Sequence, residues 1–434
     1  DNTIGGSSSG EGNVISGNGT YGVAIGVFSA AGERNVVKGN YIGTNAAGDV
    51  ALPNQRGGVY VGITSPNNTI GGATAAERNV ISGNQGSAVE LWSSGNTVIG
   101  NYVGINAAGN AALSRGVVSV YGSNNTIGGS TATERNVISG GVGLAGPSAW
   151  GNKVSGNYIG TNPAGDALLG GGGVGLQTGA HDNTIGGSTE GERNVISGST
   201  GVGVSIRDDS TSGNIVSGNY IGTNARGDAA LGNQGDGVRI EWGAHDNTIG
   251  GSTAGERNVI SGNGGLGVKL GGSTFETVSA NRVVGNYIGI NAAGDAALPN
   301  QGGGVSLGGG SQNNTLGGAS AAERNVISGN AGTGVVITGF GGPGLTFGNT
   351  VSGNYIGTNA AGTAPLPNQG SGVLVDWDTQ DNTIGGSTVA ERNVISGNSG
   401  YGVSLAAGGP NGNTVKGNYI GTDATGSAAL PNQL

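Results

Sequence analysis

The string Asn-Thr-Ile/Leu-Gly-Gly occurs seven times in this chain, and its repetition constrains the fold more than any other feature. Copies begin at residues 2, 68, 125, 183, 247, 314 and 382. A second string, Asn-x-Ile/Val followed by Gly-Asn-Tyr-Ile/Val-Gly, begins at residues 35, 96, 152, 214, 281, 349 and 413. Each long repeat therefore consists of two shorter units of about 27 to 35 residues, a period typical of repeat architectures.

Each short unit contains three brief apolar segments joined by glycine-rich turns. In the first unit these are residues 2–4, 13–15 and 23–25. Short segments with apolar residues at every second position, repeated about 14 times, predict an all-β parallel β-helix, or β-solenoid, with three strands per coil. Parallel crossovers are overwhelmingly right-handed, so we expect a right-handed helix. We expect residues 1–434 to form one solenoid of seven two-coil repeats, with the last coil incomplete.

Asparagine opens the first and second apolar segments of every coil. A side-chain amide that stacks on its own copy one coil away donates to one neighbour and accepts from the other. The sequence therefore predicts two asparagine ladders along two corners of the solenoid.

Composition excludes several other classes of protein. Glycine and proline make up 109 of 434 residues (99 and 10), but a net charge of only −9 and recurrent Ile, Val and Leu argue against disorder. Glycine does not fall at every third position, which excludes collagen. The absence of methionine favours a processed product or an excised piece. No apolar run reaches the length of a membrane span, and the acidic balance argues against nucleic-acid binding.

Residues 285–301 (GNYIGINAAGDAALPNQ) and 256–263 (ERNVISGN) resemble the right-handed parallel β-helix repeats of the pectate-lyase-like class, as found in large exported bacterial surface proteins. The resemblance implies an extracellular or cell-surface location in a bacterium. The class includes lyases, hydrolases, epimerases, adhesins and inert stalks, so it leaves the activity open. We carry no family catalytic residue onto this chain.

One cluster of charged residues interrupts an otherwise bland outward column of the third segments. It consists of Arg207, Asp208, Asp209, Arg239, Glu241 and Lys269. Adjacent coils would bring carboxylates beside cations, as polysaccharide-acting enzymes require. The alternative interpretation, which we favour, is a salt-bridged surface patch.

Aromatic residues suggest a second kind of site. Trp92, Trp242 and Trp377 follow third segments and are candidates for sugar stacking, although we favour packing beneath a loop. Tyrosine also follows the second asparagine in alternate coils, from Tyr41 to Tyr419. We interpret that column as a surface on which the long Ala-Leu-Pro loops pack.

The remaining polar motifs favour structural roles. Six Glu-Arg pairs, from residues 77–78 to 391–392, precede second segments and are interpreted as loop pins. Asp49 and its copies in the Ala-Gly-Asp loops offer Ca²⁺ ligands, but turn capping is the favoured interpretation and no cofactor is predicted. His181 and His245 occupy equivalent places before a repeat and are interpreted as corner residues.

Uniform repetition favours a structural or adhesive solenoid, a rigid part of a surface fibre, stalk or larger array. We expect end-to-end self-association or continuation in a longer chain. The alternatives are a polysaccharide lyase, hydrolase or epimerase, and a glycan-binding module that uses the charged face. A polysaccharide is the expected ligand in both alternatives, whereas nucleic acid and membrane insertion are not expected.

Overall fold

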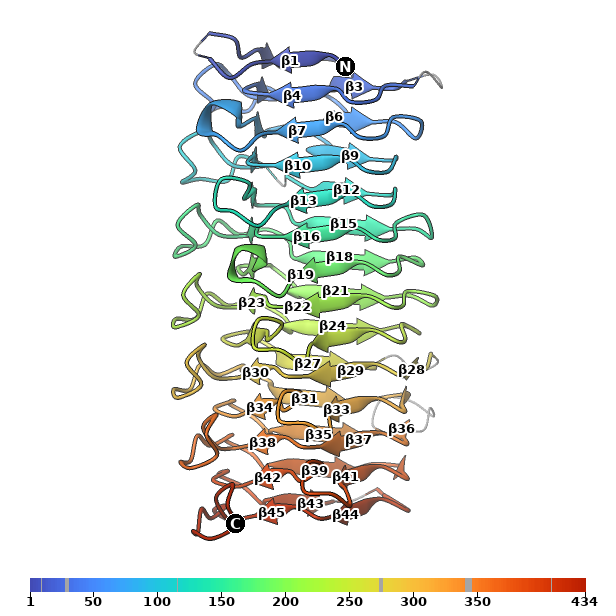
Figure 1. The fold of residues 1–434 in the computed structure, drawn as a ribbon, viewed down its shortest axis with the longest axis vertical. Coiled ribbons are helices and arrows are strands. Elements are labelled where there is room, and N and C mark those ends of the chain that lie inside the picture. The colour runs from blue at the N-terminus through green and yellow to red at the C-terminus, as the bar shows by residue number, and fades with distance from the viewer. Residues whose placement is uncertain (9, 28–30, 115, 273–275, 340–345, 407) are drawn as a thin grey trace. The chain divides into compact units, whose positions relative to one another are not determined.

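The computed structural model describes residues 1–434 except 9, 28–30, 115, 273–275, 340–345 and 407. The chain divides into two compact units, Asp1–Thr200 and Gly201–Leu434. Both consist of short strands that stack in parallel, coil upon coil (Figure 1). No helix in the described part of the chain has the length and apolar character needed to cross a membrane.

Unit 1 contains three parallel sheets. The first sheet consists of Thr3–Gly5 (β1), Val36–Lys38 (β4), Thr69–Gly71 (β7), Thr97–Ile99 (β10), Thr126–Gly128 (β13), Lys153–Ser155 (β16) and Thr184–Gly186 (β19). The second consists of Val14–Ile15 (β2), Tyr41–Ile42 (β5), Val80–Ile81 (β8), Tyr102–Val103 (β11), Val137–Ile138 (β14), Tyr158–Ile159 (β17) and Val195–Ile196 (β20). The third consists of Tyr21–Ile25 (β3), Gly57–Val61 (β6), Val89–Leu91 (β9), Val118–Val120 (β12), Val142–Ala145 (β15) and Val174–Gln177 (β18). Two single-turn 3₁₀ helices, Ala75–Glu77 (η1) and Glu190–Glu192 (η2), lie in loops before second-sheet strands.

Unit 2 repeats this plan. Its first sheet consists of Ile215–Ser217 (β22), Thr248–Gly250 (β25), Arg282–Val284 (β29), Thr315–Gly317 (β33), Thr350–Ser352 (β37), Thr383–Gly385 (β41) and Thr414–Lys416 (β44). The second consists of Tyr220–Ile221 (β23), Val259–Ile260 (β26), Tyr287–Ile288 (β30), Val326–Ile327 (β34), Tyr355–Ile356 (β38), Val394–Ile395 (β42) and Tyr419–Ile420 (β45). The third consists of Val204–Arg207 (β21), Val238–Glu241 (β24), Leu266–Leu270 (β27), Gly303–Leu307 (β31), Val335–Thr338 (β35), Val373–Asp376 (β39) and Val403–Leu405 (β43). A fourth, smaller sheet consists of Val278–Ser279 (β28), Ser311–Gln312 (β32), Thr346–Phe347 (β36) and Thr379–Gln380 (β40).

Register explains how these short strands build a core. In the first sheet Ile4 pairs with Val37, Val37 with Ile70, and Ile70 with Val98, so apolar residues form one inward column. Val37, Ile70 and Val98 have no exposed surface. Because each apolar residue stacks on its own copy, the period of the sequence sets the register of every strand. The predicted parallel β-solenoid with three strands per coil is confirmed.

The two predicted asparagine ladders are confirmed. In the second ladder Asn101 accepts hydrogen bonds through Oδ1 from the Nδ2 and backbone N–H of Asn79, at 2.9 and 3.3 Å. Its own Nδ2 donates to Asn136 Oδ1 at 3.1 Å. These asparagines lie just before the strands rather than inside them as predicted, because their amides also serve the backbone at the corner.

A third ladder was not predicted. Asn18 donates to Asn54 Oδ1 at 2.8 Å and Asn54 to Asn84 Oδ1 at 2.8 Å in unit 1. In unit 2 the same corner carries a longer series that begins with Asn233 donating to Asn263 Oδ1 at 2.9 Å. The signal was present in the sequence, since Ser-Gly-Asn and Pro-Asn-Gln recur in alternate coils. It alternates between two motifs and therefore does not appear as a single string.

Candidate functional site

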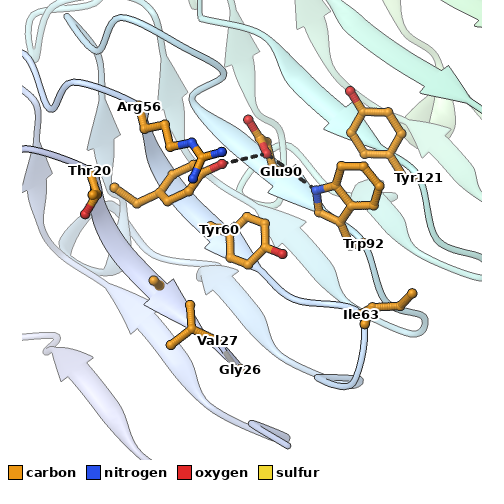
Figure 2. Close-up of a pocket in the computed structure, with 11 residues that line it drawn as sticks. Thr20, Gly26, Val27, Arg56, Tyr60, Ile63, Glu90, Trp92 and Tyr121 are labelled. Carbon is orange, nitrogen blue, oxygen red and sulfur yellow. Dashed lines mark hydrogen bonds between the residues drawn. The ribbon is translucent and has the colours of Figure 1, made fainter. Parts of the chain in front are cut away.

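A groove on the outer face of the third sheet of unit 1 is the candidate functional site. It has a volume of about 860 Å³ and is called the aromatic groove below. Four successive coils form it through β3, β6, β9 and β12 and the turns that flank them (Figure 2). It is lined by Thr20, Tyr21, Ala24, Gly26, Val27, Arg56, Tyr60, Ile63, Glu90, Trp92 and Tyr121.

Strand alternation places polar and aromatic side chains over a fully buried floor. Val59 and Val61 of β6 point inward with no exposed surface, so Tyr60 between them points outward. By the same alternation Glu90 projects outward from β9. Tyr60 pairs in register with Ala24 on one side and Glu90 on the other. The small Ala24 leaves open space in front of the tyrosine rings.

Two pairs of rings form the groove. The Tyr21 and Tyr60 ring centroids lie 4.9 Å apart with an interplanar angle of 30°. The Trp92 and Tyr121 rings stack at 4.1 Å and 21°. Each pair joins two adjacent coils, and offset rings at these separations attract one another. Trp92 remains 40% exposed, so part of its surface is available to a ligand.

Glu90 connects the two ring pairs. Tyr21 Oη donates to Glu90 Oε2 at 3.1 Å, and Trp92 Nε1 donates to the same oxygen at 3.4 Å (Figure 2). Burial, and then the Glu90 carboxylate, raise the pKa of Tyr21 to about 12. Tyr21 therefore stays protonated at neutral pH, where its hydroxyl serves as a hydrogen-bond donor.

Arg56 supplies the positive charge of the groove. Its guanidinium carbon lies 5.6 Å from the centroid of the Tyr21 ring, a loose cation–π contact. The residue is exposed. An anionic or hydroxyl oxygen in the groove would therefore meet a guanidinium donor close to the first ring pair.

The charged residues singled out in the sequence lie in unit 2. Arg207 pairs in register with Glu241, and Arg239 with Lys269. Arg239 donates to the buried carboxylate of Asp236 at 2.7 Å, and its Nη1 lies 4.0 Å from Glu241. The Arg239 guanidinium is therefore held mainly by Asp236, which sequence reasoning did not select.

Asp208 and Asp209 lie at the turn that follows β21. Asp208 has a left-handed backbone with φ of 76°, and Asp209 lies against the backbone of Gly243. Arg207 lies over the Trp242 ring at 5.2 Å. This arrangement is a surface network of ions and one ring, and a catalytic role for it stays a prediction.

The three candidate tryptophans are partly exposed. Trp92, Trp242 and Trp377 are 40, 38 and 46% exposed, so part of each ring faces solvent, and both sugar stacking and loop packing stay predictions. They are not equivalent. Each of the three directly follows its strand: Trp92 follows β9, Trp242 follows β24 and Trp377 follows β39. Trp242 and Trp377 have left-handed backbone conformations, with φ of 56° and 40°, and Trp92 does not. The difference arises because β24 and β39 extend one residue further than β9.

The tyrosine column and the Glu-Arg pairs form one structural device. Arg135 lies 3.9 Å from the Tyr158 ring centroid and donates through Nε to the Gly156 carbonyl at 3.1 Å. Glu134 Oε2 accepts the backbone N–H groups of Ser130 and Thr131, both at 3.0 Å. The hydrogen bond from the Thr131 hydroxyl, at 2.9 Å, and then that from the Ser130 N–H lower the pKa of Glu134. The pairs therefore pin their loops, as expected.

The Ala-Gly-Asp loops and the histidines make local hydrogen bonds. Asn45 Nδ2 donates to Asp49 Oδ1 at 2.8 Å, while Asn45 Oδ1 accepts the Asp49 N–H at 3.1 Å. His181 Nδ1 lies 2.9 Å from the carboxylate of Asp182, which occupies a left-handed corner with φ of 54°. Nowhere among the described residues do three His, Asp or Glu side chains gather in a manner suited to a metal ion.

No family model and no curated protein matches the chain. Among solved structures, it is similar to a mutant of the periplasmic alginate epimerase AlgG, with 15% identity and a TM-score of 0.55 over 87% of this chain and 80% of that chain. The chain has the right-handed parallel β-helix fold. Another AlgG structure has 12% identity and a TM-score of 0.41 over 87% of this chain and 80% of that chain. The A-module of an Azotobacter vinelandii mannuronan C-5 epimerase has 17% identity and a TM-score of 0.34 over 90 and 91% of the two chains.

Within this parallel β-helix, the aromatic groove occurs where the repeat is broken. Arg56 follows Asn-Gln, and the copies of that position in unit 2 are Gly235, Gly302 and Gly370. Tyr60 and Glu90 likewise replace small residues found in many other coils, such as Ser119 and Gly143. Departure from the repeat was the signal that could have located the groove from sequence. The charged cluster seen in the sequence lies in unit 2 instead.

Proposed function

We propose that this β-helix binds a polysaccharide in the aromatic groove. The observation that carries the proposal is the pair of ring stacks, Tyr21–Tyr60 and Trp92–Tyr121, joined by the Glu90 carboxylate on successive coils. Sugars present apolar C–H faces and hydroxyl edges. The aromatic ring faces complement the C–H faces of a sugar, and Glu90 and Arg56 complement its hydroxyl groups.

The composition of the groove favours binding over hydrolysis. Hydrolysis of a glycosidic bond by the common mechanisms uses two carboxyl groups, and Glu90 is the one carboxylate among the residues that line the groove as the structure describes it. The high pKa of Tyr21 also makes it a poor general base at neutral pH. An epimerase or lyase activity is the second candidate, because the similar solved structure is an alginate epimerase.

A scaffold role is compatible with glycan binding. Asparagine ladders and inward apolar columns occur in both units. We propose that the solenoid presents the groove outside the cytoplasm, as part of an adhesive or structural surface protein. The periplasmic origin of the similar epimerase supports an exported location.

Affinity electrophoresis against a panel of neutral and acidic polysaccharides tests the proposal. Trp92→Ala should raise the dissociation constant for the bound polysaccharide at least 10-fold, because half of one ring platform is lost. Trp150→Ala is the matched control, since Trp150 is 42% exposed in the same unit and lies outside the groove. Equal affinity of both variants and the wild type, or no binding to any polysaccharide, would refute the groove.

Enzyme activity is measured on the same panel. Release of unsaturated uronides or reducing ends, or a change in uronate configuration by NMR, would establish the second candidate. Loss of that activity in Glu90→Gln but not in Glu241→Gln would place the chemistry in the groove rather than in the charged patch of unit 2.

A further inference from the structure

Tyrosines of the second sheets carry an arginine guanidinium on one face. The arginine comes from the Glu-Arg pair one coil earlier. Guanidinium carbons lie 3.9–4.2 Å from the ring centroids in Arg78–Tyr102, Arg135–Tyr158, Arg257–Tyr287, Arg324–Tyr355 and Arg392–Tyr419. In four of these pairs the arginine Nε also donates to a glycine carbonyl two residues before the tyrosine, as Arg78 does to Gly100 at 3.3 Å. The fold thus builds the same guanidinium site repeatedly.

The first copy of this site lacks its arginine. Residues 10–13 are Gly-Glu-Gly-Asn where residues 76–79 are Ala-Glu-Arg-Asn, so Gly12 occupies the place of Arg78. Tyr41 is the corresponding ring, and Gly39 the corresponding carbonyl. Glu11 keeps its role, because its Oε2 accepts the Ser7 and Ser8 N–H groups at 2.8 Å. The first loop is therefore pinned like the others, but it brings no cation to its tyrosine.

A pocket of about 490 Å³ lies over Tyr41 where the arginine is missing. Gly12, Gly39, Tyr41, Arg78 and Val80 are among the residues that line it. A Cβ at Gly12 would collide with the Gly39 carbonyl oxygen, so the local backbone leaves no room for a side chain from position 12. A group that fills the pocket must therefore come from outside this loop.

We propose that the Tyr41 pocket binds a guanidinium group, presented either by an arginine side chain of a partner polypeptide or by a small guanidino compound. The group stacks on the Tyr41 ring and donates to the Gly39 carbonyl, as Arg78 does with Tyr102 and Gly100. A planar guanidinium makes both contacts together, whereas an ammonium group does not stack in this way.

Charge does not oppose this occupant. Arg78 lines the pocket, but its guanidinium is already placed over Tyr102 at 4.1 Å. Successive arginines of the same column lie two coils apart, about 10 Å, so a cation over Tyr41 would reproduce a spacing that the fold already has. The Glu11 carboxylate lies on the loop that borders the pocket and supplies a nearby negative charge.

The test is an NMR titration of the protein, carrying ¹³C-labelled tyrosine rings, with argininamide as the probe. The Tyr41 signal should shift saturably, while the Tyr102 signal stays in place because Arg78 covers that ring. Lysinamide should bind at least 5-fold more weakly. Equal shifts of both rings, equal affinity for lysinamide, or no saturable shift of Tyr41 would overturn the proposal.

Two variants and a second probe complete the experiment. Ligand-observed titrations should show loss of argininamide binding in Tyr41→Leu and retention within 3-fold in Tyr41→Phe, which keeps the ring. If Tyr41→Leu does not fold, the wild-type comparison of Tyr41 with Tyr102 decides alone. A blocked Gly-Arg-Gly peptide that binds at least 10-fold more tightly than argininamide indicates a polypeptide partner, and equal affinity indicates a small guanidino compound.

Discussion

Tyr21 Oη donates a hydrogen bond to Glu90 Oε2 over 3.1 Å, although the two residues are 69 positions apart in the sequence. The bond spans coils rather than neighbours, because β6 lies between β3 and β9 in the third sheet. It holds one wall of the aromatic groove against the other.

Glu90→Gln should lower the pKa of Tyr21 from about 12 toward its ordinary value. Burial of the phenol raises this pKa most, and Glu90 adds to it by charge and hydrogen bonding, so the change should be partial. Absorbance titration of tyrosinate, with Tyr21→Phe to identify the signal, measures the effect. An unchanged Tyr21 titration would contradict the contact.

The raised pKa of Tyr21, caused mainly by burial and then by Glu90, predicts a loss of stability in alkali. The pKa of Tyr21 is raised in the folded protein, so its contribution is fully present below the unfolded value of about 10 and is lost as the pH rises toward about 12. Chemical denaturation between these pH values should show a smaller decline in Tyr21→Phe than in the wild type. Equal declines in both proteins would argue against this linkage.

Lys153→Met should raise the pKa of Glu192. Lys153 Nζ donates to Glu192 Oε1, and this bond is the main reason that the pKa of Glu192 falls to about 2. The depressed pKa contributes stability above the unfolded value of about 4.3, and that stability is lost as the pH falls toward about 2. Carboxyl NMR titration checks the shift. Thermal unfolding at pH 3 should differ less from that at pH 7 in the variant.

Asn101→Ala should destabilise the protein by about 3 kcal/mol, because buried partners lose their hydrogen bonds. Its Nδ2 donates to the Ile70 and Ile99 carbonyls, both at 2.9 Å, and the residue is fully buried. Asn13→Ala, at an exposed rung of the same ladder, should cost less than about 1 kcal/mol. Urea denaturation compares the two. Similar losses of stability in the two variants would show that burial does not determine how much each asparagine of the ladder stabilises the protein.

Arg135→Lys should destabilise its loop by about 1 kcal/mol, although the charge is kept. An ammonium group does not reproduce both the stack on Tyr158 and the hydrogen bond to the Gly156 carbonyl. Amide hydrogen exchange should increase around residues 130–135. If the exchange rates of the variant match those of the wild type, Arg135 stabilises its loop through its charge alone.

Several features of the structure were predictable because the repeat itself encodes them. Ile4, Val37 and Ile70 recur at one position of the repeat, so the core column follows from the period. The asparagine ladders follow for the same reason. The third ladder escaped because Asn18 and Asn54 belong to motifs that look different in sequence although they stack in space.

The aromatic groove could not be derived in the same way. Tyr21, Tyr60, Trp92 and Tyr121 come from four coils, and their departures from the repeat do not by themselves show that the four rings meet. Their proximity depends on where each strand ends. One extra strand residue places Trp242 in a left-handed turn, while Trp92 lies beside Tyr121.

The sequence alone therefore determined the parallel β-helix, its register and the first two asparagine ladders, because every residue that builds them stacks on a copy of itself. Only the tertiary structure decided where a ligand could bind. The groove and the Tyr41 pocket arise from residues that differ from their copies in other coils. Whether such a residue helps to form a binding site depends on the side chains that the neighbouring coils place beside it.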